Sequence, residues 1–180
     1  MVKMKLINIL LITLLIVING VSMAESLKEI NYRGGVVKFN IPSNWVEEYE
    51  ETGGGTFYED APNTGTLRLN IITMQAPSGA KGNLPFSALS SIPVIENKNI
   101  EMLANGNAFA YSVSRSEEDG EKITLYWWYL ANQVGSSHIR LANFSYTILT
   151  SKEDDQKTKE EIKLLEVQIR KTIFHPGLGK

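Results

Sequence analysis

The chain contains no cysteine in its 180 residues. This absence excludes disulfides, thiolate nucleophiles, zinc–thiolate sites and iron–sulfur clusters. Histidine is nearly as scarce, because His138 and His175 are the only two, so histidine-based catalysis and metal binding lack ligands. Glycine and proline are too few and too scattered for a fibrous protein, and 43% hydrophobic residues are too many for a disordered chain. We therefore expect one globular domain.

The first 24 residues have the pattern of a secretory signal peptide. Lys3 and Lys5 precede an apolar run over residues 6–18, and small residues at positions 22 and 24 form a cleavage site. We expect cleavage after Ala24 and a periplasmic or secreted domain of residues 25–180. A retained membrane anchor is the alternative, but this run is too short to span about 30 Å of hydrocarbon. Because no cysteine follows the run, we expect no lipoprotein anchor.

Removal of that segment takes away two lysines and no acidic residue, so the net charge moves from −2 to −4. A mildly acidic domain has no long-range attraction for nucleic acid or anionic lipid headgroups. We expect no nucleic-acid partner and no embedding in the membrane after cleavage. No linker, repeat or low-complexity tract divides residues 25–180, which favours a single domain.

Alternation of apolar and polar residues predicts strands joined by glycine-containing turns. Because the turns are short, the strands should pair as antiparallel hairpins. The segment 76–98 is left open between a loop and a loop that contains a short helix over 86–91. The predicted strands are 36–41, 45–51, 55–59, 67–74, 100–103 continuing as 108–115, 121–134 and 137–149, and the predicted turns are 52–55, 117–120 and 135–136.

The end of the chain predicts an amphipathic helix. Thr150-Ser151-Lys152-Glu153 has the form of a capping box, which marks a helix start. His175-Pro176-Gly177 marks its end. The apolar stripe that would face the sheet consists of Ile162, Leu165, Ile169 and Ile173.

Residues 125–130 are apolar and bulky on both faces of their strand. A sheet with one face in water would alternate apolar with polar residues. We therefore expect both faces to be covered, one by the C-terminal helix and the other by the 84–98 segment together with the N-terminal residues. The predicted fold is α+β, a three-layer α/β/α sandwich around an antiparallel β-sheet. One face carries Leu125, Trp127 and Tyr129, and the other carries Tyr126, Trp128 and Leu130.

Two short segments of the sequence resemble motifs of the PsbP-like superfamily. Phe39-Asn40-Ile41-Pro42-Ser43-Asn44-Trp45 closes the first predicted strand, and Ile169-Arg170-Lys171-Thr172-Ile173-Phe174 closes the last helix. A hairpin, a mid-chain insert and three long strands lie between them, so the resemblance covers about residues 30–175. The superfamily includes the extrinsic photosystem II protein, a yeast Ran-binding import factor and exported bacterial proteins of unknown role. The resemblance implies a non-enzymatic binding or assembly protein and supplies no site residues.

Four motifs could carry chemistry, and each lacks the partners that its chemistry requires. We therefore expect no catalytic, cofactor-binding or metal-binding residues. Calcium needs alternating oxygen ligands, a phosphate loop needs Gly-Lys-Ser/Thr before a helix, a catalytic triad needs an orienting carboxylate, and a glycosidase needs carboxylates across a cleft. The motifs are the acidic run 117–121, Gly53-Gly54-Gly55, His138 beside Ser136 and Ser137, and the glutamates at 47, 48, 50 and 51.

The leading functional hypothesis is a non-enzymatic exported accessory protein that acts through a protein partner. One version is an immunity-type inhibitor that neutralises a toxin, since a mildly acidic surface suits a basic partner. Exposed tyrosine and phenylalanine are favoured at interfaces, although most aromatic residues here should belong to the core. The 76–98 segment is a second contact loop. The candidate partner-contact residues are Gly53, Gly54, Phe57 and Tyr58.

A second hypothesis, from another class, is a protein that binds a small apolar or carbohydrate ligand. The ligand would lie between the sheet and its covering segment, with Trp127 or Trp128 lining the pocket. A hydrolase is the third hypothesis, and the residues give it almost no support.

Overall fold

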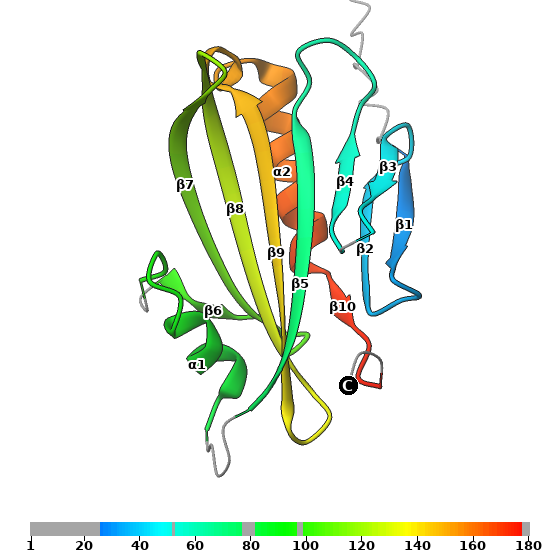
Figure 1. The fold of residues 1–180 in the computed structure, drawn as a ribbon, viewed down its shortest axis with the longest axis vertical. Helices are drawn as coiled ribbons and strands as arrows, with labels where there is room; N and C mark the ends of the chain where they lie inside the picture. The colour runs from blue at the N-terminus through cyan, green and yellow to red at the C-terminus, as the bar shows by residue number, and fades with distance from the viewer. Residues whose placement is uncertain (1–25, 52, 77–81, 97–98, 178–180) are drawn as a thin grey trace, which may run out of the picture.

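The computed structural model describes residues 26–51, 53–76, 82–96 and 99–177. These residues form a seven-stranded sheet in the order β3-β4-β5-β9-β8-β7-β6, a three-stranded sheet in the order β1-β2-β10, and two α-helices (Figure 1). The proposed signal peptide and its cleavage site after Ala24 lie outside the described residues. The elements are β1 Leu27–Tyr32, β2 Val37–Pro42, β3 Val46–Tyr49, β4 Gly55–Tyr58, β5 Thr66–Gln75, α1 Leu84–Ser90, β6 Glu101–Met102, β7 Ala108–Glu118, β8 Glu121–Val134, β9 His138–Leu149, α2 Gln156–Arg170 and β10 Ile173–Phe174.

The long strands pair as the turn signals predicted. Neighbours β5, β9, β8 and β7 are all antiparallel, so the antiparallel sheet is confirmed. Between β7 and β8 the connection is tighter than expected, because only Asp119 and Gly120 lie outside the strands, both with positive φ. Two such residues form a type I′ turn, whose twist matches that of the flanking strands. The connection between β8 and β9 is longer than expected, since it holds three residues, 135–137.

The two faces of β8 enter two separate clusters of buried residues. Trp128 and Leu130 lie in the main core with α2, and Tyr129 and Ala131 lie in a smaller cluster beneath α1. The α+β class, with helices on both faces of an antiparallel sheet, is therefore confirmed. Figure 1 shows α2 between β9 and β5, behind the large sheet, and α1 at the β6 end of the sheet.

The N-terminal strands cover the face opposite to the one predicted. β1, β2 and β10 form the small sheet on the α2 side, where Phe39 contacts Phe57 and Phe144 edge to face at 5.3 and 5.0 Å between ring centroids. Apolar alternation shows that a strand has a buried face, but it does not identify the layer that buries it. The expectation that N-terminal residues share the α1 face was therefore wrong.

The last helix begins later and ends earlier than the sequence predicted. Residues 150–152 form one 3₁₀ turn, and α2 starts at Gln156. The expected capping box does not form, because Glu153 accepts hydrogen bonds from Arg115 and Thr124. Ile173 leaves the helical stripe altogether and pairs with Lys38 as part of β10, where its side chain is exposed.

The open segment 76–98 contains a short helix, in agreement with the second of the two alternatives. α1 is capped by Asn83, whose side chain accepts a hydrogen bond from the Phe86 amide at 3.0 Å. Leu89 is fully buried against the sheet. Residues 77–81 and 97–98 of this segment lie outside the described residues. In the part of the chain that the structure describes, neither helix has the length and apolarity needed to cross a membrane.

Candidate functional site

The glycine-rich hairpin presents less surface than its sequence suggested. Phe57 has no exposed area, because its ring contacts Phe39 in the main core. Gly54 is also buried. These two predicted partner-contact residues are therefore corrected to interior positions. Alternation placed Phe57 and Tyr58 on opposite faces, but the sequence did not say which face was inside.

The other two predicted contact residues of the hairpin lie nearer the surface and are already in contact with neighbours. The Tyr58 hydroxyl donates a hydrogen bond to Glu48 at 2.9 Å, which raises the tyrosine pKa. Gly53 has a φ of 95°, and a Cβ at that position would lie 1.8 Å from the Arg33 guanidinium. The hairpin is therefore held against the loop after β1, and it offers no cluster of exposed aromatic side chains among the residues described.

The structure separates the two adjacent tryptophans that the sequence nominated for a pocket. Trp128 is fully buried beside Tyr111 in the main core, so it lines no pocket. Trp127 lies half-buried on the opposite face of the sheet, on the side of α1. Of the pair, Trp127 alone occupies the place that the second hypothesis required, between the sheet and its covering segment.

Trp127 and Tyr129 form the floor of a shallow hollow. Their rings are stacked, with centroids 6.1 Å apart and 12° between the planes. The Trp127 indole N–H donates to Ser114 at 3.1 Å, and burial raises the pKa of Tyr129, an effect that its hydrogen bond with Ser112 partly offsets. The hollow has a volume of about 400 Å³ and is lined by Val94, Ser112, Val113, Ser114, Trp127 and Tyr129.

This hollow exists because α1 covers only part of the sheet face. Tyr129 is 6% exposed beneath the helix, whereas Leu125 and Trp127 extend beyond it and stay half-buried. The rim is mixed, since Val94 is 64% exposed and apolar, whereas Ser112 and Ser114 of β7 bring hydroxyl groups to the same side of the sheet as Trp127. The sequence prediction that the whole of residues 125–130 is covered on both faces is therefore correct for one half of this face and wrong for the other.

One edge of the seven-stranded sheet is open beside the hollow. β6 pairs only with Ala108 and Phe109, so the rest of β7, from residue 110 to residue 118, has no second strand among the described residues. Figure 1 shows β7 at this margin, with β6 and α1 near only one of its ends. An unpaired strand edge presents a row of backbone donors and acceptors to any other chain.

The type I′ turn fixes which residues of β7 present those groups. In a two-residue hairpin, the residues that flank the turn exchange both backbone hydrogen bonds, and bonded pairs then recur at every second position. Glu118 and Glu121 flank the turn, so the even-numbered residues of β7 bond to β8. The odd-numbered ones point their N–H and C=O groups outward. The same parity holds at the other end, where the Asn107 carbonyl accepts from the Leu103 amide at 2.8 Å.

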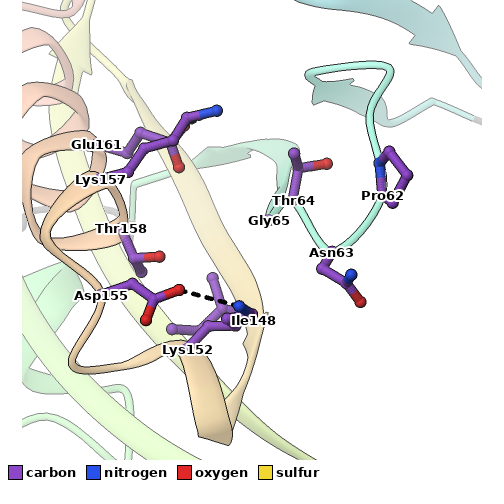
Figure 2. Close-up of a pocket in the computed structure, with 10 residues that line it drawn as sticks. All are labelled: Pro62, Asn63, Thr64, Gly65, Ile148, Lys152, Asp155, Lys157, Thr158 and Glu161. Carbon is purple, nitrogen blue, oxygen red and sulfur yellow. Dashed lines mark ion pairs between the residues drawn. The ribbon is translucent and has the colours of Figure 1, made fainter.

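A separate, polar cleft lies between the loop before β5 and the start of α2 (Figure 2). It has a volume of about 220 Å³, and its charged groups face one another. Lys152 lies 3.1 Å from Asp155, and Lys157 bridges Glu59 and Glu161. The residues that line this cleft are Pro62, Asn63, Thr64, Gly65, Ile148, Lys152, Asp155, Lys157, Thr158 and Glu161.

The wall of this cleft contains a buried hydrogen bond that the sequence did not reveal. The Tyr146 hydroxyl donates to the Glu161 carboxylate at 2.6 Å, and both side chains are buried. Burial and the neighbouring carboxylate raise the pKa of Tyr146 strongly. The two residues come from β9 and α2, so their spacing in the sequence does not predict that they are in contact. Their position, sealed behind paired charges, is that of a structural link between helix and sheet.

Arg140 is a second feature that sequence reasoning missed. It is fully buried, and burial lowers its pKa. Its guanidinium donates to the Thr73 hydroxyl and to the carbonyls of Val36 and His175, at 3.0, 3.1 and 2.7 Å. Its Nη2 atom finds no hydrogen-bond partner among the described residues. Arg140 thus joins β5 and β9 to the two segments that flank the small sheet.

No protein-family model and no curated protein matches the sequence. Solved structures do match. A protein from Bacteroides thetaiotaomicron VPI-5482 aligns with a TM-score of 0.56 and 21% identity over 85% of this chain, which spans only half of the Bacteroides chain. LpqN, described as involved in cell envelope biogenesis of Mycobacterium tuberculosis, aligns with a TM-score of 0.54 and 11% identity over 84% of this chain and 91% of its own.

These two alignments show a shared fold. The PsbP protein of Synechocystis sp. PCC 6803 also matches, with 13% identity and a TM-score of 0.36, over 87% of this chain and 96% of its own. The observed order of hairpin, mid-chain insert, three long strands and final helix is the order on which the resemblance was based. The architecture therefore agrees with the PsbP-like fold that the sequence predicted, on the order of its elements and on the first two alignments.

Proposed function

We propose that this chain is an exported, non-enzymatic protein that binds another protein through the hollow beside α1. The observation that carries the proposal is the stacked Trp127–Tyr129 floor, in which Trp127 is half-buried and Val94 beside it is 64% exposed. Aromatic side chains in a partly desolvated hollow are the usual anchor points of protein interfaces. A pocket for a small molecule normally encloses most of its ligand, and a shallow surface with an exposed rim does so poorly.

Two observations support a non-enzymatic role. The charged side chains of the polar cleft are engaged with opposite charges, so they form a closed set of ion pairs. His138, the one histidine in the long strands, contacts only the neighbouring Ser137 hydroxyl among the hydrogen bonds of the described residues. A nucleophile, its base and an orienting group do not converge at either place.

Export to the periplasm or beyond is supported by the pattern of residues 1–24 and is consistent with the envelope role named for LpqN. The finer form of the proposal, an inhibitor that neutralises a toxin, needs a partner of complementary charge. The net charge of −4 after cleavage suits a basic partner.

Site-specific photo-crosslinking in the cells that make the protein tests this function. A photoreactive amino acid at Val94 should give a discrete adduct with a second protein. The same amino acid at Lys163, an exposed position of α2, is the matched control and should give none. Absence of an adduct from Val94, or equal adducts from both positions, would overturn the proposed surface.

A small ligand that stacks on Trp127 is the second candidate function, favoured by the flat Trp127–Tyr129 pair. Tryptophan fluorescence distinguishes it well, because Trp45 and Trp128 are at most 3% exposed and Trp127 is the accessible indole. Titration with oligosaccharides and with a fluorescent apolar probe should then shift the emission of the protein and leave that of Trp127→Phe unchanged. An emission that does not respond to any of these compounds would count against this candidate.

A further inference from the structure

Building on the proposed function, we infer that the partner contributes an extended segment with basic residues, which adds as an eighth strand to the open edge of β7. The hollow at Trp127 would receive one of its apolar side chains. The occupant is thus specified by three features of the described residues: unpaired backbone groups, an apolar margin beside them, and an acidic end.

The backbone groups come first, because they determine that the occupant is extended. Tyr111, Val113, Arg115 and Glu117 are the odd-numbered residues of β7 beyond its pairing with β6, and their N–H and C=O groups point away from β8. These residues recur at every second position, which matches the two-residue repeat of a β-strand. A helix or a small molecule cannot satisfy such a row, whereas an added strand satisfies every member.

The exposed side chains along the open edge of β7 are apolar next to the hollow. Tyr111 is 37% exposed and Val113 is 43% exposed on the α2 side, and the Trp127 hollow lies on the other side of the same strand. Alternate side chains of an added strand point to opposite faces. One set would therefore pack over Val113, and the next residue would reach toward Trp127 and Val94.

The acidic end specifies the charge of the occupant. Residues 116–122 contain four carboxylate side chains and one lysine. The neighbouring Arg115 donates two hydrogen bonds to the Glu153 carboxylate. Acidic side chains at an edge discourage pairing with other acidic strands. They attract a segment that carries lysine or arginine at the end lying beside Asp119 and Glu121.

Synthetic peptides and amide hydrogen exchange test the inference on the purified protein. The probe is a ten-residue peptide of alternating threonine and valine with two lysines at its N-terminus or its C-terminus, which distinguishes antiparallel from parallel addition. The control peptide carries two glutamates instead. We expect slower exchange at the amides of Tyr111, Val113, Arg115 and Glu117 with a lysine peptide, and binding about tenfold weaker for the glutamate peptide.

The matched variants are Val113→Pro and Val113→Thr. Proline removes one outward N–H without touching a bond to β8, and edge strands tolerate it there, so circular dichroism should show the native fold while the lysine peptide loses at least about tenfold in affinity. Threonine keeps the N–H and loses only part of the apolar contact of the side chain, so Val113→Thr should bind the lysine peptide clearly more tightly than Val113→Pro does. The exchange pattern of the unmodified protein decides the case even if Val113→Pro fails to fold.

Two results would overturn the inference. The first is an exchange pattern without slowing at the four odd-numbered amides. The second is slowing that rises with protein concentration alone, together with a dimer in sedimentation, because the occupant is then a second copy of this chain. If the Val94 crosslink forms while the edge amides stay unprotected, strand addition fails and the proposed function stands. If the Val94 crosslink is absent while the amides are protected, the hollow is not the contact surface and the edge alone binds.

Discussion

At the scale of single residues, the structure divides adjacent aromatic side chains between interior and surface. Phe57 belongs to the core and Tyr58 to the margin, and Trp128 and Trp127 divide in the same way. Alternation along a strand predicts this division for every such pair. Which member is inside depends on the layer packed against the strand, and that information is not local. Phe57 and Trp128, both named as candidate contact or pocket residues, were therefore interior.

Phe57→Ala should destabilise the protein strongly, whereas Tyr58→Phe should hardly do so. Phe57 has no exposed area and contacts Phe39, so truncation leaves a cavity and costs about 3–5 kcal/mol. Tyr58→Phe removes only a surface hydrogen bond to Glu48, which contributes little because water replaces it readily. Urea unfolding monitored by circular dichroism measures both. Equal losses would mean that Phe57 is not a core residue.

The Tyr146–Glu161 link predicts a pH dependence at alkaline pH. The folded-state pKa of Tyr146 is raised, and an unfolded tyrosine ionises near pH ~10. Below that pH both states hold the phenol proton, so the stability contribution is complete. Above it the unfolded state releases the proton and the folded state keeps it, so the free energy of unfolding falls as pH rises.

Tyr146→Phe removes both the hydrogen bond and the titrating group. It should cost about 1–3 kcal/mol at pH ~7, since it leaves a buried carboxylate short of one donor. It should also flatten the loss of stability above pH ~10, because the variant has no phenol at this site. Urea midpoints of parent and variant at both pH values provide the comparison. A parent whose alkaline loss is undiminished in Tyr146→Phe would show that other tyrosines cause it.

At the scale of elements, the long strands of the large sheet were predictable, whereas β1, β10 and the helix boundaries were not. Strand β5 differs from the predicted span by one residue at each end, since its alternation and its flanking turns are local signals. The capping box at Thr150 failed because Glu153 is used by Arg115 and Thr124, which lie on other elements. The stripe of the helix was extended wrongly to Ile173 because an apolar residue at helical spacing can also begin a strand.

The type I′ turn between β7 and β8 gives a prediction for this hairpin. Gly120 has a φ of 83°, and a Cβ added there would have no atom within 4 Å, so Gly120→Ala costs only the strain of the left-handed backbone, about 1 kcal/mol. Asp119→Asn should be nearly neutral, because asparagine accepts positive φ readily. Thermal unfolding of the two variants compares them directly. If Gly120→Ala left the stability unchanged, the turn would not be of type I′. The assignment of the odd-numbered residues of β7 as outward-pointing would then lose its basis.

At the scale of the whole molecule, two apolar clusters of unequal size lie on the two faces of one sheet. The main cluster joins α2, the small sheet and the large sheet, and the smaller one lies beneath α1. The sequence showed that β8 carries bulky apolar residues on both faces, and this pattern predicted a fold of three layers. The assignment of the N-terminal hairpin to a layer was not readable, because it depends on contacts such as Phe39 with Phe144, which lie far apart in the chain.

The smaller size of the cluster beneath α1 predicts that α1 opens before the rest of the protein. The helix has seven residues and is held through Ala88 and Leu89 in the smaller cluster, so its opening leaves the main core intact. Segments with few buried apolar contacts open locally at a free energy below that of global unfolding. Native-state hydrogen exchange should therefore give lower protection for the described amides of 84–92 than for those at the centres of β8 and β9.

Leu89→Ala and Leu165→Ala form the matched pair for this prediction, since both leucines are at most 1% exposed. Each truncation costs about 2–5 kcal/mol of the state that buries it. Leu89→Ala should raise exchange in α1 far more than in β9, whereas Leu165→Ala, in the main core, should raise exchange in every strand. Because α1 borders the Trp127 hollow, its opening would also expose Tyr129. A partner that binds the hollow should consequently slow exchange in α1, and a uniform response of all elements to Leu89→Ala would show that the two clusters unfold as one.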